Sequence, residues 1–116
     1  MKNLLLVLTL TTTLLSNAQK QFAGCWESSN SNFTTTILAD DKKVSKVFNF
    51  SFRKNRFINE DIISQNPNEI KTKLVNDRTG YTVIVKYYLK NKDTLINEYS
   101  GDYNEKVSLT RVKINN

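Results

Sequence analysis

The sequence has no histidine and a single cysteine, Cys25, among its 116 residues. Without histidine it lacks the commonest general acid or base and the commonest zinc ligand of proteins. One cysteine cannot form an internal disulfide, and no histidine is present to activate it as a nucleophile. We therefore expect Cys25 to be a small buried apolar residue, and we predict no catalytic residue, no metal site and no cofactor.

Neighbouring carboxylates are also scarce, since Asp40-Asp41 and Glu60-Asp61 are the only adjacent pairs. Adjacent side chains on a strand point to opposite faces, so such a pair converges on one substrate only at a turn. Asp40-Asp41 precedes Lys42-Lys43 and is typical of a solvated turn. Glu60-Asp61 is expected at the polar end of a strand, with a calcium site as the remote alternative. The sequence therefore predicts that the protein is not an enzyme.

Long apolar runs are limited to one, residues 4–15, which follows the positive charge of Lys2. Ser16 and Ala18 place small residues at positions −3 and −1 of a signal-peptidase site. The run of about a dozen apolar residues is too short for the roughly 20 that span a bilayer. We predict that residues 1–18 are a cleaved signal peptide.

The remaining residues, 19–116, are enough for one domain, and they contain no second apolar run that could be a transmembrane segment. We expect this domain to be exported, either to a periplasm or outside the cell. The alternative is a lipoprotein anchored at Cys25, because residues 22–25 loosely resemble a lipoprotein cleavage box. In such a box the apolar run adjoins the cysteine, whereas here polar residues intervene.

Positive charge is in excess, with a formal net charge of +6, but it is not concentrated on one element. The basic clusters are Lys42-Lys43, Arg53-Lys54-Asn55-Arg56 and Lys90-Asn91-Lys92, and all of them fall at expected turns. The aromatic residues lie on apolar faces and not among these charges. The pattern indicates solubilising charges, and we predict no nucleic-acid partner.

Apolar residues alternate with polar ones along almost the whole domain, as in half-buried strands. In residues 80–90 the apolar face consists of Tyr81, Val83, Val85, Tyr87 and Leu89. In residues 47–53 we expect Phe48, Phe50 and Phe52 to face inward. The expected strands are the segment at Trp26, then 32–39, 47–53, 56–63, 69–75, 80–90, 93–99 and 106–114.

Short turn segments separate these strands, and no amphipathic helix is predicted between them. Eight strands at intervals of roughly ten to twelve residues are typical of an all-β barrel or sandwich. Connections too short for crossover helices favour antiparallel neighbours. We predict an all-β fold, an eight-stranded antiparallel up-and-down barrel with short strands, because closure removes exposed sheet edges.

Arg111 lies in phase with Val107 and Leu109, so it is expected to point inward on the last strand. A buried guanidinium needs hydrogen-bond acceptors or an aromatic face. In a closed barrel the first and last strands are neighbours, so we expect Arg111 to stack on Trp26.

Gly24-Cys25-Trp26 near the start of the domain and Arg111 on the last strand resemble the lipocalin-like (calycin) barrels, in the minimal form of exported bacterial proteins. In that family a G-x-W motif and a basic residue on the last strand close one end of the barrel. The resemblance implies this structural role for Gly24, Trp26 and Arg111.

The resemblance also implies a binding protein that holds a small hydrophobic molecule in the barrel. The candidate ligand-binding residues are Phe48, Phe50, Phe52, Tyr81, Val83, Val85 and Tyr87. One alternative is that these side chains simply fill a solid barrel. A second is a module that binds a secreted protein, such as a small β-barrel protease inhibitor, through residues 19–22 or through solvent-facing Tyr88, Tyr99 or Tyr103.

Overall fold

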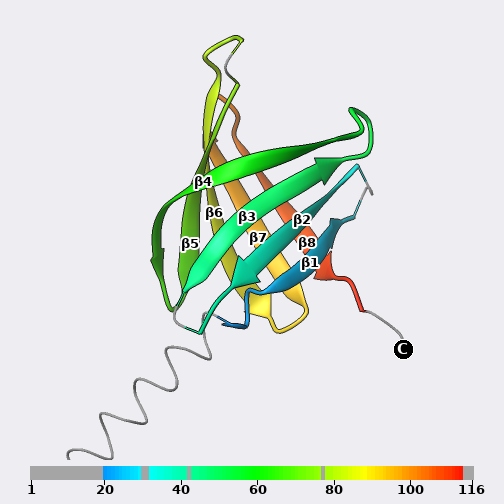
Figure 1. Cartoon of the computed structure of the whole chain (residues 1–116), viewed down its shortest axis with the longest axis vertical. Helices are drawn as coiled ribbons and strands as arrows, with labels where there is room; N and C mark the ends of the chain where they lie inside the picture. The colour runs from blue at the N-terminus through cyan, green and yellow to red at the C-terminus, as the bar shows by residue number, and fades with distance from the viewer. Residues whose placement is uncertain (1–19, 30–31, 42, 77, 114–116) are drawn as a thin grey trace, which may run out of the picture.

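The computed structural model describes residues 20–29, 32–41, 43–76 and 78–113, and these residues form a closed antiparallel β-barrel (Figure 1). The predicted signal peptide, residues 1–18, lies outside the described residues. Each strand pairs with the next along the chain, and β1 pairs with β8 to close the barrel. The strands are β1 (Gly24–Ser28), β2 (Phe33–Ala39), β3 (Val44–Ser51), β4 (Arg56–Asn66), β5 (Glu69–Val75), β6 (Thr82–Asn91), β7 (Thr94–Gly101) and β8 (Glu105–Arg111). The predicted eight-stranded up-and-down barrel is confirmed.

Alternating burial along the strands separates an inner from an outer face, as the side-chain period of two requires. On β6, Val83, Val85 and Tyr87 are buried, whereas the residues between them are half-buried on the outside. The apolar core fills the barrel from the end that contains Phe22 and Trp26 to its middle. Its buried members are Phe22, Trp26, Ile37, Val44, Val47, Ile70, Val83, Val85, Tyr87, Leu95 and Leu109.

The strand β4 changes its pairing partner halfway along its length. Residues 56–60 pair with β3, whereas residues 61–66 pair with β5. The first half of β4 is therefore unpaired on the side of β5, and Leu74 and Val75 of β5 pair only with β6. This separation opens the barrel wall between the β3–β4 hairpin and the β5–β6 hairpin, whose tips diverge in Figure 1.

The inward orientation expected for Phe48, Phe50 and Phe52 is corrected by the structure. Val47 is fully buried and Asn49 bonds to side chains inside the barrel, so the alternate residues Phe48 and Phe50 face outward. Phe52, in the turn that follows, is 53% exposed. These three side chains therefore line no part of the barrel interior.

No helix among the described residues is long and apolar enough to cross a membrane.

Candidate functional site

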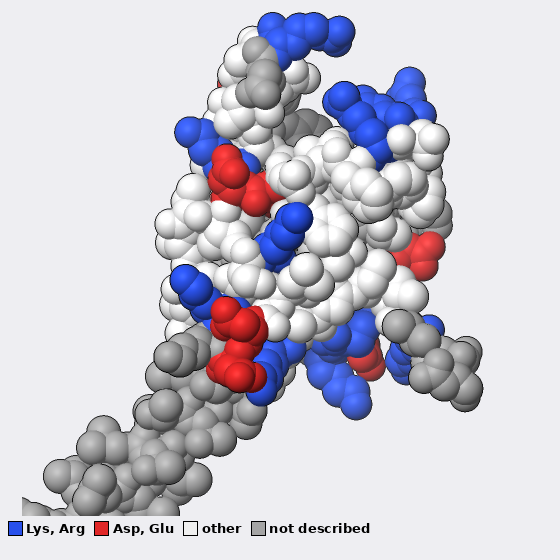
Figure 2. Space-filling view, in the orientation of Figure 1, with Lys and Arg blue, Asp and Glu red and all other residues white. Residues whose placement is uncertain are grey.

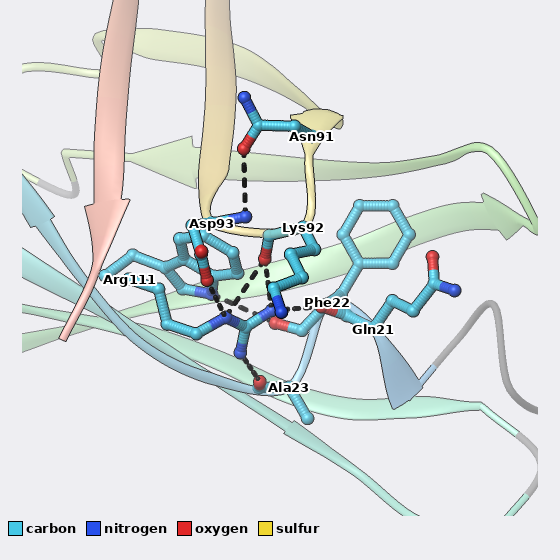
Figure 3. Close-up of polar contacts among 8 residues, drawn as sticks. Gln21, Phe22, Ala23, Asn91, Lys92, Asp93 and Arg111 are labelled. Carbon is cyan, nitrogen blue, oxygen red and sulfur yellow. Dashed lines mark hydrogen bonds and ion pairs between the residues drawn. The ribbon is translucent and has the colours of Figure 1, made fainter. Parts of the chain in front are cut away.

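Arg111 closes one end of the barrel by binding backbone carbonyls from two distant segments (Figure 3). Nη1 donates to the Ala23 carbonyl at 2.7 Å, and Nη2 donates to the carbonyls of Gln21 at 2.7 Å and Lys92 at 3.0 Å. Nε donates to the same Lys92 carbonyl at 3.1 Å and lies 3.7 Å from an Asp93 carboxylate oxygen. The guanidinium is thus held by several acceptors. We call this the closed end.

Trp26 lies directly beneath this arginine. The Arg111 guanidinium carbon is 4.2 Å from the centre of the indole ring, and the two residues are paired in the β1–β8 register. The indole Nε1 donates to the Phe22 carbonyl at 3.0 Å, and both Trp26 and Phe22 are buried. The stacking expected between Trp26 and Arg111 is present.

The close approach of the Arg111 guanidinium to β1 favours a glycine at position 24. Its φ of +137° lies in a region that residues with a side chain rarely adopt, and an added Cβ would lie 2.9 Å from Arg111 Nη1. Cleavage immediately before Cys25, as the lipoprotein alternative requires, would remove Gly24 together with the Gln21, Phe22 and Ala23 carbonyls described above. Residues 21–24 are therefore part of the closed end.

A cluster of polar side chains occupies the middle of the barrel. Glu60 of β4 is 6% exposed and accepts hydrogen bonds from Thr72, Asn49 and Tyr87. The Tyr87 hydroxyl lies 2.7 Å from both carboxylate oxygens, and Thr35 donates to Asn49 Oδ1. No basic side chain of the described residues forms an ion pair with Glu60. The carboxylate is therefore held by neutral donors alone.

Burial raises the pKa of Glu60 above its ordinary value, although the hydrogen bonds from Thr72, Tyr87 and Asn49 act in the opposite direction. Burial also raises the pKa of Tyr87 well above its usual range, and it raises that of Tyr99 to about 12. Tyr99 accepts a hydrogen bond from Asn97 Nδ2, whereas no donor of the described residues reaches the buried Asn97 Oδ1. The interior of the barrel thus contains a group of hydrogen-bonded polar side chains in addition to the apolar core.

Because the folded protein binds the Glu60 proton more tightly than the unfolded chain, the contribution of Glu60 to stability should fall as the pH rises from about 4.5, its ordinary pKa, through the raised value. The Glu60→Gln variant cannot titrate there, so we expect it to gain stability relative to wild type over this range. Urea unfolding between about pH 4 and pH 8 measures the difference. The matched control is Glu105→Gln, the same substitution at an exposed position. A difference between wild type and Glu60→Gln that is constant with pH would contradict this assignment.

Two pockets lie at the opposite end of the barrel, which we call the open end, near the turns 52–55 and 76–81. The larger has a volume of about 830 Å³ and occupies the opening beside the first half of β4. It is lined by Lys54, Arg56, Ile58, Leu74, Val75, Asn76, Arg78, Tyr81 and Val83. The smaller, of about 380 Å³, shares Lys54 and Ile58 with it and reaches Asn49 and Tyr99 of the interior.

The rim of the larger pocket is basic. Lys54 and Arg56 come from the β3–β4 hairpin, and Arg78 comes from the β5–β6 turn. Figure 2 shows Lys and Arg side chains over both hairpin tips, with a hollow between them. None of these three residues forms a salt bridge within the described part of the chain. Their charges are therefore available to a bound anion.

The structure divides the candidate ligand-binding residues into three groups. Val85 and Tyr87 are fully buried in the core, Val83 and Tyr81 line the larger pocket, and the three phenylalanines lie outside the barrel. Sequence reasoning missed the basic rim, and it was wrong to expect Glu60 at the polar end of a strand, since Glu60 is buried in the middle of β4. Glu60 lies in phase with Ile58 and Ile62 on β4, and that spacing was a signal for its inward position.

The residues considered for protein binding are also separated. Tyr99 points into the barrel and does not face solvent, whereas Tyr88 donates to Glu98 at 3.1 Å on the outside. Tyr103 is 43% exposed in the β7–β8 turn. Phe22 is 1% exposed and packed at the closed end, so residues 20–22 do not form a projecting trunk.

Among the described residues, no three Cys, Asp or Glu side chains are grouped so that they could hold a metal ion. Glu60 and Asp61 point to opposite faces of β4, one buried and one exposed. No protein-family model, curated protein or solved structure matches this chain. The class of the protein is defined by its fold and its two pockets. It is an eight-stranded up-and-down barrel that is closed at one end and open at the other.

Proposed function

We propose that this protein is a lipocalin-like binding protein whose open end holds a small, partly apolar molecule that carries an anionic group. The observation that carries the proposal is the larger pocket, whose volume of about 830 Å³ falls within the 300–1,000 Å³ typical of small-molecule sites. Closure of the other end by Trp26 and Arg111 supports entry from this side. The filled middle of the barrel supports a ligand near the mouth and not along the barrel axis.

The lining of the pocket indicates the chemistry of the ligand. Ile58, Leu74 and Val83 provide an apolar wall, and Lys54, Arg56 and Arg78 surround it with positive charge. Apolar burial would supply affinity, while a charged group at the rim would set the orientation. An amphipathic carboxylate, sulfonate or phosphate of modest size fits this pattern better than a neutral hydrocarbon.

A fluorescent probe with the same chemistry, 8-anilinonaphthalene-1-sulfonate, tests the pocket directly. We expect saturable binding to the folded protein, and we expect Arg56→Ala/Arg78→Ala to raise the Kd about tenfold through loss of charge-assisted contacts. The matched control Lys43→Ala/Lys90→Ala removes two exposed cations elsewhere and should leave the Kd within about twofold of wild type. Equal weakening in both variants would indicate nonspecific attraction and overturn the assignment.

Native mass spectrometry of protein purified without denaturation, followed by organic extraction, would identify a molecule that copurifies with the barrel. An apo mass together with absence of probe binding would contradict the small-ligand proposal. Binding to a secreted protein, the alternative from the sequence, would then be tested by pull-down.

A further inference from the structure

The outer face of the β3–β4 hairpin carries an exposed aromatic cluster that the proposed ligand site does not use. Phe57 is 66% exposed and Phe52 is 53% exposed, which is unusual for such large apolar side chains. Phe50 contacts both, with ring centres 5.1 Å from Phe52 and 5.0 Å from Phe57, and Phe48 lies 5.8 Å from Phe57. We call this cluster the aromatic patch; its members are Phe48, Phe50, Phe52 and Phe57.

The pairing of β3 with β4 builds the patch on one surface. Phe50 lies directly opposite Phe57, and Phe48 lies opposite Asn59, so the rings share the outer face of the hairpin. In the sequence, four of the six phenylalanines lie within ten consecutive residues, 48–57. Their inward neighbours are smaller or polar, so the patch is not a by-product of core packing.

Positive charge flanks the aromatic patch at both ends. Residues 44–59 contain four cations and no Asp or Glu: Lys46, Arg53, Lys54 and Arg56. Lys46 Nζ lies 5.6 Å from the centre of the Phe48 ring, and the other three cations cluster at the hairpin tip. Asp61 is the nearest acidic residue along β4 on the outer face, and it lies beyond the patch toward the closed end.

We propose that the β3–β4 hairpin docks the open end of the barrel on an anionic phospholipid bilayer, with the aromatic patch inserted at the level of the headgroups and the flanking cations on lipid phosphates. Exposed aromatic groups surrounded by Lys and Arg are the combination that binds proteins to anionic bilayer surfaces. The hairpin projects from the barrel in Figure 1, so it presents a convex edge that can enter an interface. The aromatic patch itself lies on the outer face and lines neither pocket, whereas Lys54 and Arg56 are shared with the rim of the larger pocket.

A second copy of the chain is a poorer occupant of this surface. A twofold contact packs the same patch of each copy against the other, so it would bring together two surfaces whose residues 44–59 carry four cations and no Asp or Glu. Like charges in such a contact oppose association. An anionic bilayer instead satisfies both the aromatic and the basic parts of the surface.

Cosedimentation of the full chain with vesicles tests the proposal. We expect binding to vesicles of phosphatidylcholine mixed with phosphatidylglycerol, weak binding to phosphatidylcholine alone, and a loss of binding as salt is added. Phe52→Ser/Phe57→Ser should lower the partition coefficient at least about tenfold, because it removes most of the inserted apolar area. Arg53→Ala/Lys54→Ala should lower it by about fivefold for each cation removed.

The matched control is Ile63→Ser/Val112→Ser, which removes two exposed apolar side chains outside the patch, 51% and 39% exposed. It should bind the anionic vesicles like wild type. Circular dichroism and thermal unfolding verify that each variant retains the barrel. Absence of binding to anionic vesicles, equal loss in the control, or an unchanged partition coefficient in Phe52→Ser/Phe57→Ser would overturn the proposal. So would a dimer in solution that the same phenylalanine variant abolishes.

Discussion

Replacing Trp26 by alanine should lower the free energy of unfolding by about 3–5 kcal/mol, the range for removing a large buried aromatic side chain. Trp26 is fully buried, its Nε1 satisfies the Phe22 carbonyl, and its ring supports the Arg111 guanidinium. The truncation therefore leaves a cavity, an unpaired Phe22 carbonyl and a guanidinium that has lost its aromatic contact. Chemical unfolding with urea, followed by circular dichroism, measures the loss.

Two further variants give this measurement its controls. Trp26→Phe keeps an aromatic ring and loses the indole N–H, so it should fall between wild type and Trp26→Ala. Tyr103→Ala, at a ring that is 43% exposed in a turn, should cost less than about 1 kcal/mol. A loss below about 1 kcal/mol for Trp26→Ala would show that this side chain does not close the barrel.

The second large effect is expected from Arg111→Ala, which should cost about 2–3 kcal/mol. This variant removes a charged donor shared by three backbone carbonyls, and hydrogen bonds to charged groups contribute about 1.5–3 kcal/mol each before solvent exposure reduces them. The ion pair with Asp93 adds little, because both side chains are partly exposed. Arg111→Lys should recover only a minor part, since an ammonium cannot reach three acceptors in a fixed planar arrangement.

A double-mutant cycle separates the stacking from the hydrogen bonds. Combining Trp26→Ala with Arg111→Ala should cost less than the sum of the single losses, by about 0.5–2 kcal/mol, because each variant removes the same cation–π contact. Additive losses within about 0.5 kcal/mol would mean that the two residues stabilise the closed end independently.

The barrel could be predicted from the sequence because the features that specify it lie within single strands and single turns. Alternating apolar residues on strands such as β6 determine the face, and short polar turns require antiparallel neighbours. The one non-local pairing could also be predicted, since Arg111 in phase with Leu109 needed an aromatic or polar partner on the neighbouring first strand. Trp26 was the only tryptophan available to supply that partner.

The inner face of β3 was misassigned because the larger side chains were taken to be the buried ones. Phe48 and Phe50 are more apolar than Val47 and Asn49, yet Asn49 is needed inside, where it donates to Glu60. A buried carboxylate must be hydrogen-bonded, and an inward Asn49 supplies one of the donors, which leaves Phe48 and Phe50 on the outer face. Glu60 lies in phase with two isoleucines on β4, so the periodicity contained the information that corrects β3.

The open-end pocket could not be predicted from periodicity at all. It depends on the residue at which β4 leaves β3 and begins to pair with β5, and a change of pairing partner has no period-two signature. It also depends on the β5–β6 hairpin, which brings Arg78 opposite Arg56 across a gap of more than twenty residues in sequence. The sequence shows both cations but not that they face one cavity.

The closed end has a kinetic consequence, because it joins the two ends of the chain. Every other strand pair forms between neighbours in sequence, whereas the Arg111 bonds to Ala23 and Gln21 span 88 and 90 residues. Closing such a long loop in an unfolded chain costs conformational entropy. The cost is lower once the hairpins between β1 and β8 have formed, because they shorten the flexible part of the loop. We therefore expect the local hairpins to form first and the β1–β8 pair to form last, so that the Trp26–Arg111 contact affects the unfolding rate more than the folding rate.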